Sequence, residues 1–235
     1  MNQKEQVIEA MKNNGGYATL QQLNVLVDVS KWKSKTPYAS IRRIVQVNNE
    51  FFKIKPGLWA LREYEKCVFD KFEIKKGDKK SEDYFTHGYY QGILIEMGNM
   101  HHYETYVPAQ DKNRRFLETP LKEIATVPEL PNFSYDYILR KAKTVDVIWF
   151  NERMLPYRFY EVEHSTDIKN SLNKFFELQD FRTDYYIIAD DSRKKQFYDI
   201  MECSIYSPIR DYVKFFSYEN LVKQYESERS LVETI

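Results

Sequence analysis

The first third of the chain alternates short apolar-periodic segments with turn-forming residues. Apolar residues recur at helical spacing from Val7 to Met11, and Gly15 and Gly16 are expected to end this helix. A second short helix is predicted over residues 19–27. The pattern therefore predicts two helices before the first long polar stretch.

A third helix is predicted in "KTPYASIRRIVQVNN", with Thr36 as N-cap and Pro37 in the first turn. Ile41, Ile44 and Val45 fall on one side of it. The following "EFFKIKPGLWALRE" predicts two short strands around a Pro-Gly turn. Three helices followed by a hairpin is the element order of a winged helix.

A polar and charged stretch, "EIKKGDKKSEDY", predicts a linker. We expect an N-terminal winged-helix domain over residues 1–65, a linker over 66–83 and a second domain over 84–235.

The second domain is predicted to combine helices and strands. It is expected to begin with a helix from Tyr84, weakened by Gly88 and Gly92, followed by a strand at "HYETYVP" and a loop-rich stretch with three prolines. Two strands are then expected on either side of "NERMLP", and after them a helix with the apolar stripe Ile168, Leu172, Phe175 and Phe176. A strand at "TDYYIIADD" and tail helices with a strand at "VKFFS" complete the domain. Ser165 and Thr166 are expected to cap the helix. Helix, three strands, helix and strand predict a mixed α/β fold, overall an α+β arrangement of two domains.

Charge is balanced over the whole chain, with 35 basic and 35 acidic residues, but it is unevenly placed. Between Ser30 and Arg62 eight basic residues stand against one acid, Glu50. Such a segment predicts a module that binds a polyanion.

Cysteine content and hydropathy indicate the compartment. Cys67 and Cys203 are far apart and outside any metal-binding motif, which excludes a disulfide framework and a zinc-thiolate site. The chain shows neither a signal-peptide pattern nor an apolar run long enough to cross a bilayer. A cytoplasmic protein without a membrane partner is expected.

Three acidic residues are predicted to converge on one hairpin. Glu161 and Glu163 stand at positions i and i+2 of a strand and share a face. If the hairpin folds about the middle of "NERMLP", facing residue numbers sum to 307, which pairs Asp146 with Glu161. Like charges held this close need a compensating cation or proton, and hard oxygen ligands suit Mg²⁺ or Mn²⁺.

The alternative for these acids is a solvent-exposed edge strand, where acidic residues often alternate. The flanking "RFY" and "HST" and the apolar strand downstream favour a central strand instead. A basic module beside a carboxylate metal site predicts phosphodiester hydrolysis.

Residues from about Lys4 to Glu63 resemble the HARE-type helix-turn-helix domain found beside bacterial restriction enzymes, through "KSKTPYASIRRIVQ" and "FFKIKPGLWAL". The resemblance implies that the third helix and the wing contact double-stranded DNA. The candidate DNA-binding residues are Lys33, Lys35, Thr36, Tyr38, Arg42, Arg43, Gln46, Lys53 and Lys55. The alternative is a basic face that contacts only protein.

Residues 84–218 resemble the PD-(D/E)xK nuclease superfamily, most clearly in "DVIWF" and "FYEVEHSTDIKNSLNKFFEL". The resemblance implies a restriction-endonuclease-like αβββαβ core. Asp146 matches the metal-binding Asp and Glu161 the first acidic ligand, whereas Glu163 replaces the usual Lys in an E-x-E variant.

Because Glu163 stands in place of the usual Lys, the sequence does not decide which side chain activates the attacking water. Glu163 is one candidate, and a lysine from the following helix, Lys169 or Lys174, is the other. Glu96 matches an additional acidic residue that some relatives place on the preceding helix.

The resemblances predict a Mg²⁺- or Mn²⁺-dependent endodeoxyribonuclease of the type II restriction class. A homodimer and a cognate methyltransferase are candidate partners. The alternatives are nuclease action on RNA or branched DNA, and a non-catalytic DNA-binding regulator that keeps the nuclease fold as a docking or dimerisation platform.

Overall fold

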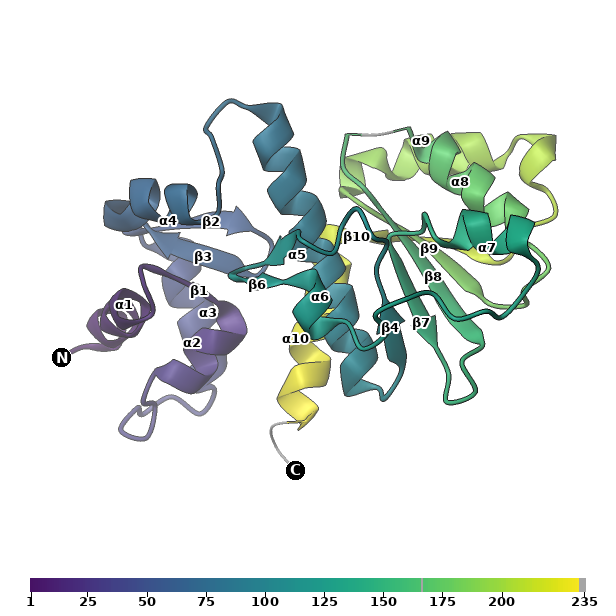
Figure 1. Ribbon diagram of the computed structural model, residues 1–235. Helices are drawn as coiled ribbons and strands as arrows, with labels where there is room; N and C mark the ends of the chain where they lie inside the picture. Colours follow the sequence, from purple (N-terminus) through teal and green to yellow (C-terminus); the bar gives the residue numbers. More distant parts are fainter. Residues whose placement is uncertain (166, 233–235) are drawn as a thin grey trace. The chain divides into compact units, whose positions relative to one another are not determined.

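The structure, a computed structural model, describes residues 1–165 and 167–232 (Figure 1). It divides into two compact units, Met1–Ser81 and Glu82–Val232. The boundary falls inside the segment 66–83, expected to be a linker, which contains most of one helix and the start of another. Thr166, one of the two predicted capping residues, lies outside the described residues.

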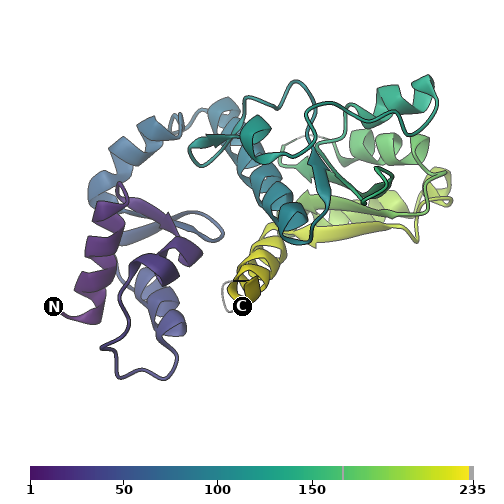
Figure 2. The same cartoon turned by 60° about the horizontal axis from the view of Figure 1, so that its bottom comes forward.

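The first unit combines four helices with a small antiparallel sheet of order β1-β3-β2 (Figure 2). Its elements are α1 (Gln3–Asn13), β1 (Tyr17–Thr19), α2 (Leu20–Leu26), α3 (Pro37–Val47), β2 (Phe51–Lys55), β3 (Leu58–Leu61) and α4 (Glu65–Lys71). The three expected helices and the two strands around the Pro-Gly turn are confirmed, whereas β1 and α4 were not predicted.

Helix α3 forms for the reason that the sequence predicts. Thr36 occupies the N-cap position and Pro37 the first turn, although the Thr36 side chain makes no capping hydrogen bond. Ile41 and Val45 are buried against the core of this unit, which also includes Val7. The opposite side of the helix is left exposed.

The second unit is built on a five-stranded mixed sheet of order β10-β9-β8-β7-β4. Its elements are α5 (Lys79–Met100), β4 (Glu104–Tyr106), β5 (Arg115–Phe116), β6 (Thr119–Pro120), α6 (Leu121–Ile124), α7 (Asp136–Ala142), β7 (Val147–Phe150), β8 (Pro156–Glu163), α8 (Ile168–Glu177), β9 (Asp184–Ala189), α9 (Lys194–Met201), β10 (Val213–Ser217) and α10 (Tyr218–Val232). The predicted mixed α/β character is confirmed, and β8 is a central strand because β7 and β9 flank it.

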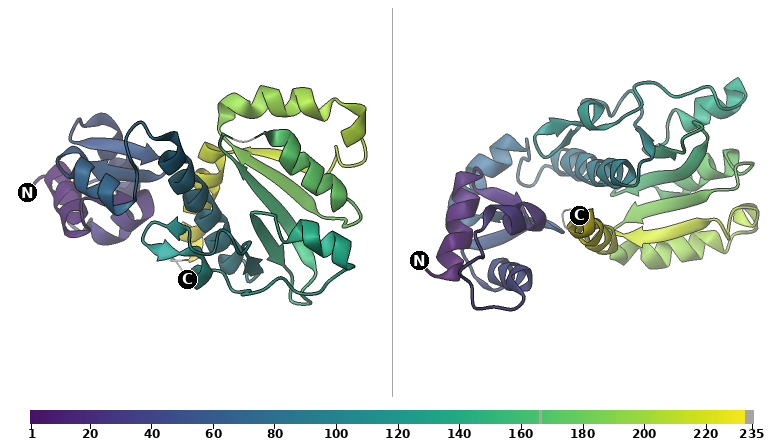
Figure 3. Two further views of the ribbon diagram at one scale, coloured as in Figure 1. Left: turned by 45° about the horizontal axis from the view of Figure 1, so that its top comes forward. Right: turned by 90° about the horizontal axis from the view of Figure 1, so that it is seen from below.

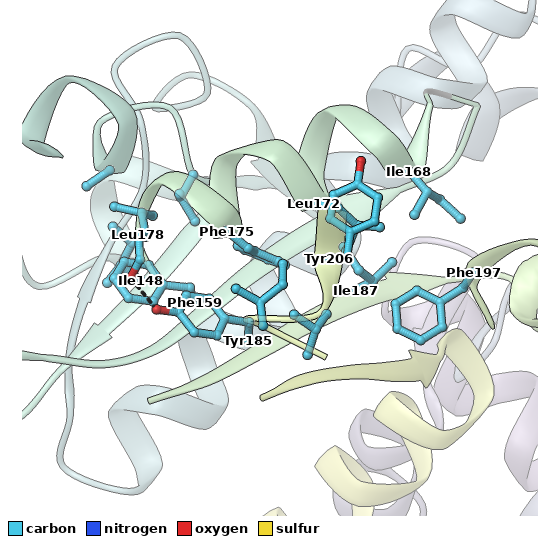
Figure 4. Close-up of a cluster of buried hydrophobic side chains, with 14 of the residues drawn as sticks. Ile148, Phe159, Ile168, Leu172, Phe175, Leu178, Tyr185, Ile187, Phe197 and Tyr206 are labelled. Atoms are coloured by element: carbon cyan, nitrogen blue, oxygen red, sulfur yellow. Dashed lines mark hydrogen bonds between the residues drawn. The ribbon is translucent and has the colours of Figure 1, made fainter. Parts of the chain in front are cut away.

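Helices cover both faces of this sheet: α7, α8 and α9 lie on one face, and α5 and α10 on the other (Figure 3). On the α8 face, Phe159 of β8 packs with Phe175 of α8 and Tyr185 of β9 in the main core (Figure 4). On the α5 face, the Trp149 indole donates to the backbone carbonyl of Leu94 over 3.0 Å. The alternation of side chains along β8 thus places Glu161 and Glu163 on the α8 face, with Phe159.

One local prediction, the cap of helix α8, needs correction. Helix α8 is capped by Asp167, whose side chain accepts from the amide of Lys169, and not by Ser165. The Ser165 hydroxyl instead donates to Asp83 over 2.5 Å. Asp167 directly precedes the first helical residue, so its carboxylate reaches the amide of Lys169, whereas Ser165 stands two residues before that position.

Candidate active site

The β7–β8 pair has the register predicted from the sequence. Val147 pairs with Tyr160 and Ile148 with Phe159, so the facing numbers sum to 307. Asp146, however, does not lie in the strand: it occupies a bend one residue before β7. Its Oδ2 accepts a 2.7 Å hydrogen bond from the amide of Val162, which ties it to β8.

The three predicted carboxylates are all buried. Asp146 is 7% exposed, Glu161 2% and Glu163 3%. A group of acids this deeply buried requires partners, because transfer of each charge from water is costly.

Helix α8 supplies two of these partners. Lys174 Nζ lies 2.9 and 2.8 Å from the two carboxylate oxygens of Glu161 and also donates to the carbonyl of Thr144 over 2.8 Å. One turn earlier, the hydroxyl of Ser171 contacts both Glu161 and Glu163. The two residues are three positions apart, so they share one face of the helix.

The charges around Glu161 are incompletely balanced. Burial, followed by the negative charge of Asp146, raises the pKa of Glu161 well above its ordinary value, against the opposing effects of Lys174 and Ser171. Burial alone would lower the pKa of Lys174, but Glu161 and Asp146 outweigh it and the pKa is raised. Lys174 is therefore a cation at neutral pH, and Glu161 favours a proton or another cation beside it.

Asp146 also faces helix α5. Its Oδ2 lies 3.2 Å from Nε2 of His87, and the amide of Gln91 donates to its backbone carbonyl over 3.0 Å. Burial would raise the pKa of Asp146, but His87, Lys174 and the Val162 amide outweigh it and hold the pKa below its ordinary value. His87, Asp111 and Asp146 form a group whose ligand atoms all lie within 4.8 Å of one another.

Two glycines of α5 allow the segment that contains Asp111 to approach the helix. A Cβ at Gly88 would lie 2.7 Å from the carbonyl oxygen of Arg115, and one at Gly92 would lie 2.2 Å from Cβ of Phe116. The sequence predicts a helix that these glycines weaken, and α5 runs through both. Their lack of a side chain is needed for the close packing.

Replacing Gly92 by Ala should therefore lower the free energy of unfolding. The added methyl group clashes with buried Phe116, at a cost of about 1–3 kcal/mol, which exceeds the gain of about 1 kcal/mol from helix propensity. Urea denaturation measures the change. In a Phe116→Gly background, which removes the Cβ as well as the ring, the same substitution should cost nothing or stabilise, and an equal loss in both backgrounds would refute the clash.

Comparison with protein families gives a match, which spans the second unit and the residues just before it. The family described as the type II restriction enzyme NmeDI C-terminal domain matches residues 68–235, more than half of the chain. The chain belongs to this family. Comparison with curated proteins and with solved structures gives no match.

Membership in the NmeDI C-terminal domain family indicates a type II restriction function, with endonuclease activity and DNA as the partner. Restriction endonucleases typically use a divalent metal, and two groups of side chains in this unit fit one. The three predicted carboxylates supply hard oxygen ligands, and the His87, Asp111 and Asp146 group adds an imidazole.

No helix within the described residues is long and apolar enough to span a membrane.

The remaining predicted site residues are not equally close to Glu161 in this NmeDI-type domain. Lys169 is exposed on α8 and has no side-chain partner in the described structure, whereas Lys174 contacts Glu161 directly. Glu96 forms an ion pair of 2.7 Å with Arg229 of α10 and, within the described residues, contacts none of the other predicted acids.

The candidate DNA-binding residues lie on α3, the segment before it, and β2. All of them are exposed except Lys55, which is partly buried; they are Lys33, Lys35, Thr36, Tyr38, Arg42, Arg43, Gln46, Lys53 and Lys55. They therefore lie on the surface of the first unit.

Sequence reasoning missed four residues at this site: His87, Gln91, Asp111 and Ser171. The spacing of His87 and Gln91 and that of Ser171 and Lys174 are helical signals that could have paired them. No local pattern marks Asp111 as a member of this group. Arg114 contacts it from three positions away, but His87, Gln91 and Asp146 lie 20 to 35 positions away.

Proposed function

We propose that the chain is a divalent-metal-dependent DNA endonuclease whose catalytic group is Asp146, Glu161, Glu163 and Lys174. The observation on which this rests is Glu161: a carboxylate buried in the middle of the sheet, beside a second carboxylate, with a lysine bound to both its oxygens. Charges are concentrated this way in active sites, where shifted pKa values serve chemistry.

Asp146, Glu161 and Glu163 are the residues that would hold the metal. A bound divalent cation supplies charge neutralisation at the phosphate and a more acidic water. The buried acids at the end of the β7–β8 pair match the E-x-E version of the PD-(D/E)xK pattern. The αβββαβ core is supported by α5, the sheet strands β4, β7 and β8, then α8 and β9, with β5, β6, α6 and α7 inserted between β4 and β7.

Lys174 replaces the lysine that the strand lacks. It remains protonated at neutral pH, so it stabilises negative charge and does not accept a proton. Glu163 is then the group that takes the proton from the attacking water, and Ser171 holds its carboxylate next to Glu161. Lys169, exposed to solvent, would contact phosphate instead.

The first unit acts as a winged helix that binds double-stranded DNA through α3 and the β2–β3 hairpin. Its support is the order of three helices and a hairpin, together with the exposed basic side of α3. A homodimer would supply the two active sites needed to cut both strands, and a cognate methyltransferase would protect the host DNA.

The proposal is tested by incubating the protein with unmethylated and methylated plasmid DNA, with Mg²⁺ or with EDTA. Discrete fragments that require Mg²⁺ and form from one of the two DNAs are expected. Retained DNA binding without cleavage in Mg²⁺ or Mn²⁺ would instead favour the non-catalytic regulator.

Substituting Arg43 and Lys53 together by Ala should weaken DNA binding and reduce its salt dependence. Each lost phosphate contact lowers the slope of log K against log salt by about 1. Fluorescence anisotropy at several salt concentrations measures this slope. Lys66 is exposed on α4, so Lys66→Ala should leave the slope unchanged. If Lys66→Ala changed the slope as much per removed charge as the Arg43 and Lys53 substitutions do, net charge and not the α3–β2 surface would determine DNA binding.

A further inference from the structure

We propose that His87, Asp111 and Asp146 form a second cation site, specific for a first-row divalent transition ion and distinct from the site at Glu161 and Glu163. It rests on the proposed function only in sharing Asp146 with the catalytic group.

Two separations between the ligand atoms match those around one ion. His87 Nε2 lies 3.2 Å from Asp146 Oδ2 and 3.9 Å from Asp111 Oδ2. Ligands bound at about 2.0–2.2 Å are separated by roughly 3–4 Å from their neighbours around the metal. Nε2 of His87 is buried and makes no hydrogen bond of good geometry within the described residues, so its 3.2 Å contact with Asp146 is an ion pair, a contact that a cation bound to both side chains would replace.

An independent observation comes from Gln91, one helical turn after His87. Its side chain is completely buried, and its amide nitrogen donates to Asp111 Oδ2 over 2.9 Å and to the Asp146 carbonyl over 3.0 Å. Because both partners are oxygen acceptors, the amide nitrogen and not the amide oxygen must face them, which determines the orientation of the Gln91 amide. Its Oε1 is buried without any hydrogen-bond partner. An unpaired buried carbonyl oxygen is costly, and a cation or its bound water would satisfy it.

Neighbouring residues hold the three ligands in place. Arg114 Nε lies 2.5 Å from Asp111 Oδ1, which leaves Oδ2 directed toward His87 and Gln91. The Val162 amide holds Asp146. Ligands oriented by such partners bind metals more tightly than free ones.

The composition of the group selects the type of ion. One imidazole nitrogen with two carboxylates favours ions such as Mn²⁺, Co²⁺ or Zn²⁺, whereas the all-carboxylate group at Glu161 and Glu163 suits Mg²⁺. The two groups are therefore expected to differ in ion preference although they share one residue.

The test uses Mn²⁺ with the full chain, with binding followed by the EPR signal of the free ion. Wild type should bind two ions per chain. His87→Asn should lose one of them, with affinity at that site reduced at least about tenfold, and Glu161→Gln should lose the other. His102→Asn is the matched control, since His102 is exposed and has a φ of 61°, which Asn tolerates.

Electron spin-echo spectroscopy provides a second measurement that does not depend on stoichiometry. Mn²⁺ bound to wild type and to the His102 variant should show coupling to an imidazole nitrogen, and the His87 variant should not. Circular dichroism confirms that each variant is folded.

The outcomes separate this site from the proposed catalytic one. Unchanged Mn²⁺ binding in His87→Asn, or wild type without nitrogen coupling, would overturn the second site and leave His87 and Asp146 as an ion pair. Loss of an ion in His87→Asn but not in Glu161→Gln would support the second site and contradict metal binding at Glu161.

Discussion

Glu161→Gln should abolish DNA cleavage while the protein remains folded. The carboxylate stands between Asp146 and Lys174, where it contributes the negative charge that a divalent cation requires. Gln keeps the shape but removes this charge, so the cleavage rate should fall at least about a hundredfold, as is typical when one charge-stabilising group is lost. Plasmid cleavage at saturating Mg²⁺ measures the effect.

The same substitution should change stability only modestly. The raised pKa of Glu161 means that folding disfavours its charged form, and Gln removes that cost, but the amide nitrogen of Gln cannot accept from Lys174 as the lost oxygen does. These two effects oppose each other, so the free energy of unfolding at neutral pH should change by no more than about 1–2 kcal/mol. Glu177→Gln, an exposed acid on α8, is the matched control and should cleave normally. Undiminished cleavage by the Glu161 variant would exclude this residue from the active site.

Lys174→Met should reduce cleavage by about a hundredfold or more, within the range expected for the loss of an acid–base or charge-stabilising side chain. Met preserves most of the apolar stem but removes the cation that contacts both oxygens of Glu161. Single-turnover cleavage measures the rate, and a DNA-binding assay shows whether substrate affinity changes. Lys174→Arg, which keeps a positive charge, should retain more activity than the Met variant.

Lys169→Met distinguishes the two lysines of α8. Lys169 is exposed and has no side-chain partner in the described structure, so its loss should weaken DNA binding slightly and leave the single-turnover rate within about threefold, the scale of a surface charge. If Lys169→Met abolished cleavage and Lys174→Met did not, the assignment of roles would have to be reversed.

The register of the β7–β8 hairpin could be predicted because it depends on local information. A short turn and a side-chain period of two determine which residues face each other, so the pairing of Glu161 with the position of Asp146 follows from the numbers alone. A bulge does occur, but it lies between Trp149 and Phe150, at the turn end, and does not shift the pairs next to the acids.

The choice between Lys169 and Lys174 could not be made in the same way. Both residues lie on the polar part of α8, and periodicity places them only relative to Ile168 and Leu172. The direction in which α8 crosses β8 brings Ser171 and Lys174 to Glu161, and that direction is set by packing of Leu172 and Phe175 in the core.

By itself, the sequence determined the mixed α/β character, the three helices and hairpin of the first unit, the basic segment around α3 and the register of the β7–β8 hairpin. These features depend on spacing within about twenty residues, where periodicity, capping and turn chemistry act directly. Only the tertiary structure decided that Lys174 contacts Glu161 and that His87 and Asp111 meet Asp146. The latter contacts join three segments through the close packing allowed by Gly88 and Gly92, and such packing depends on the whole core, which no local pattern encodes.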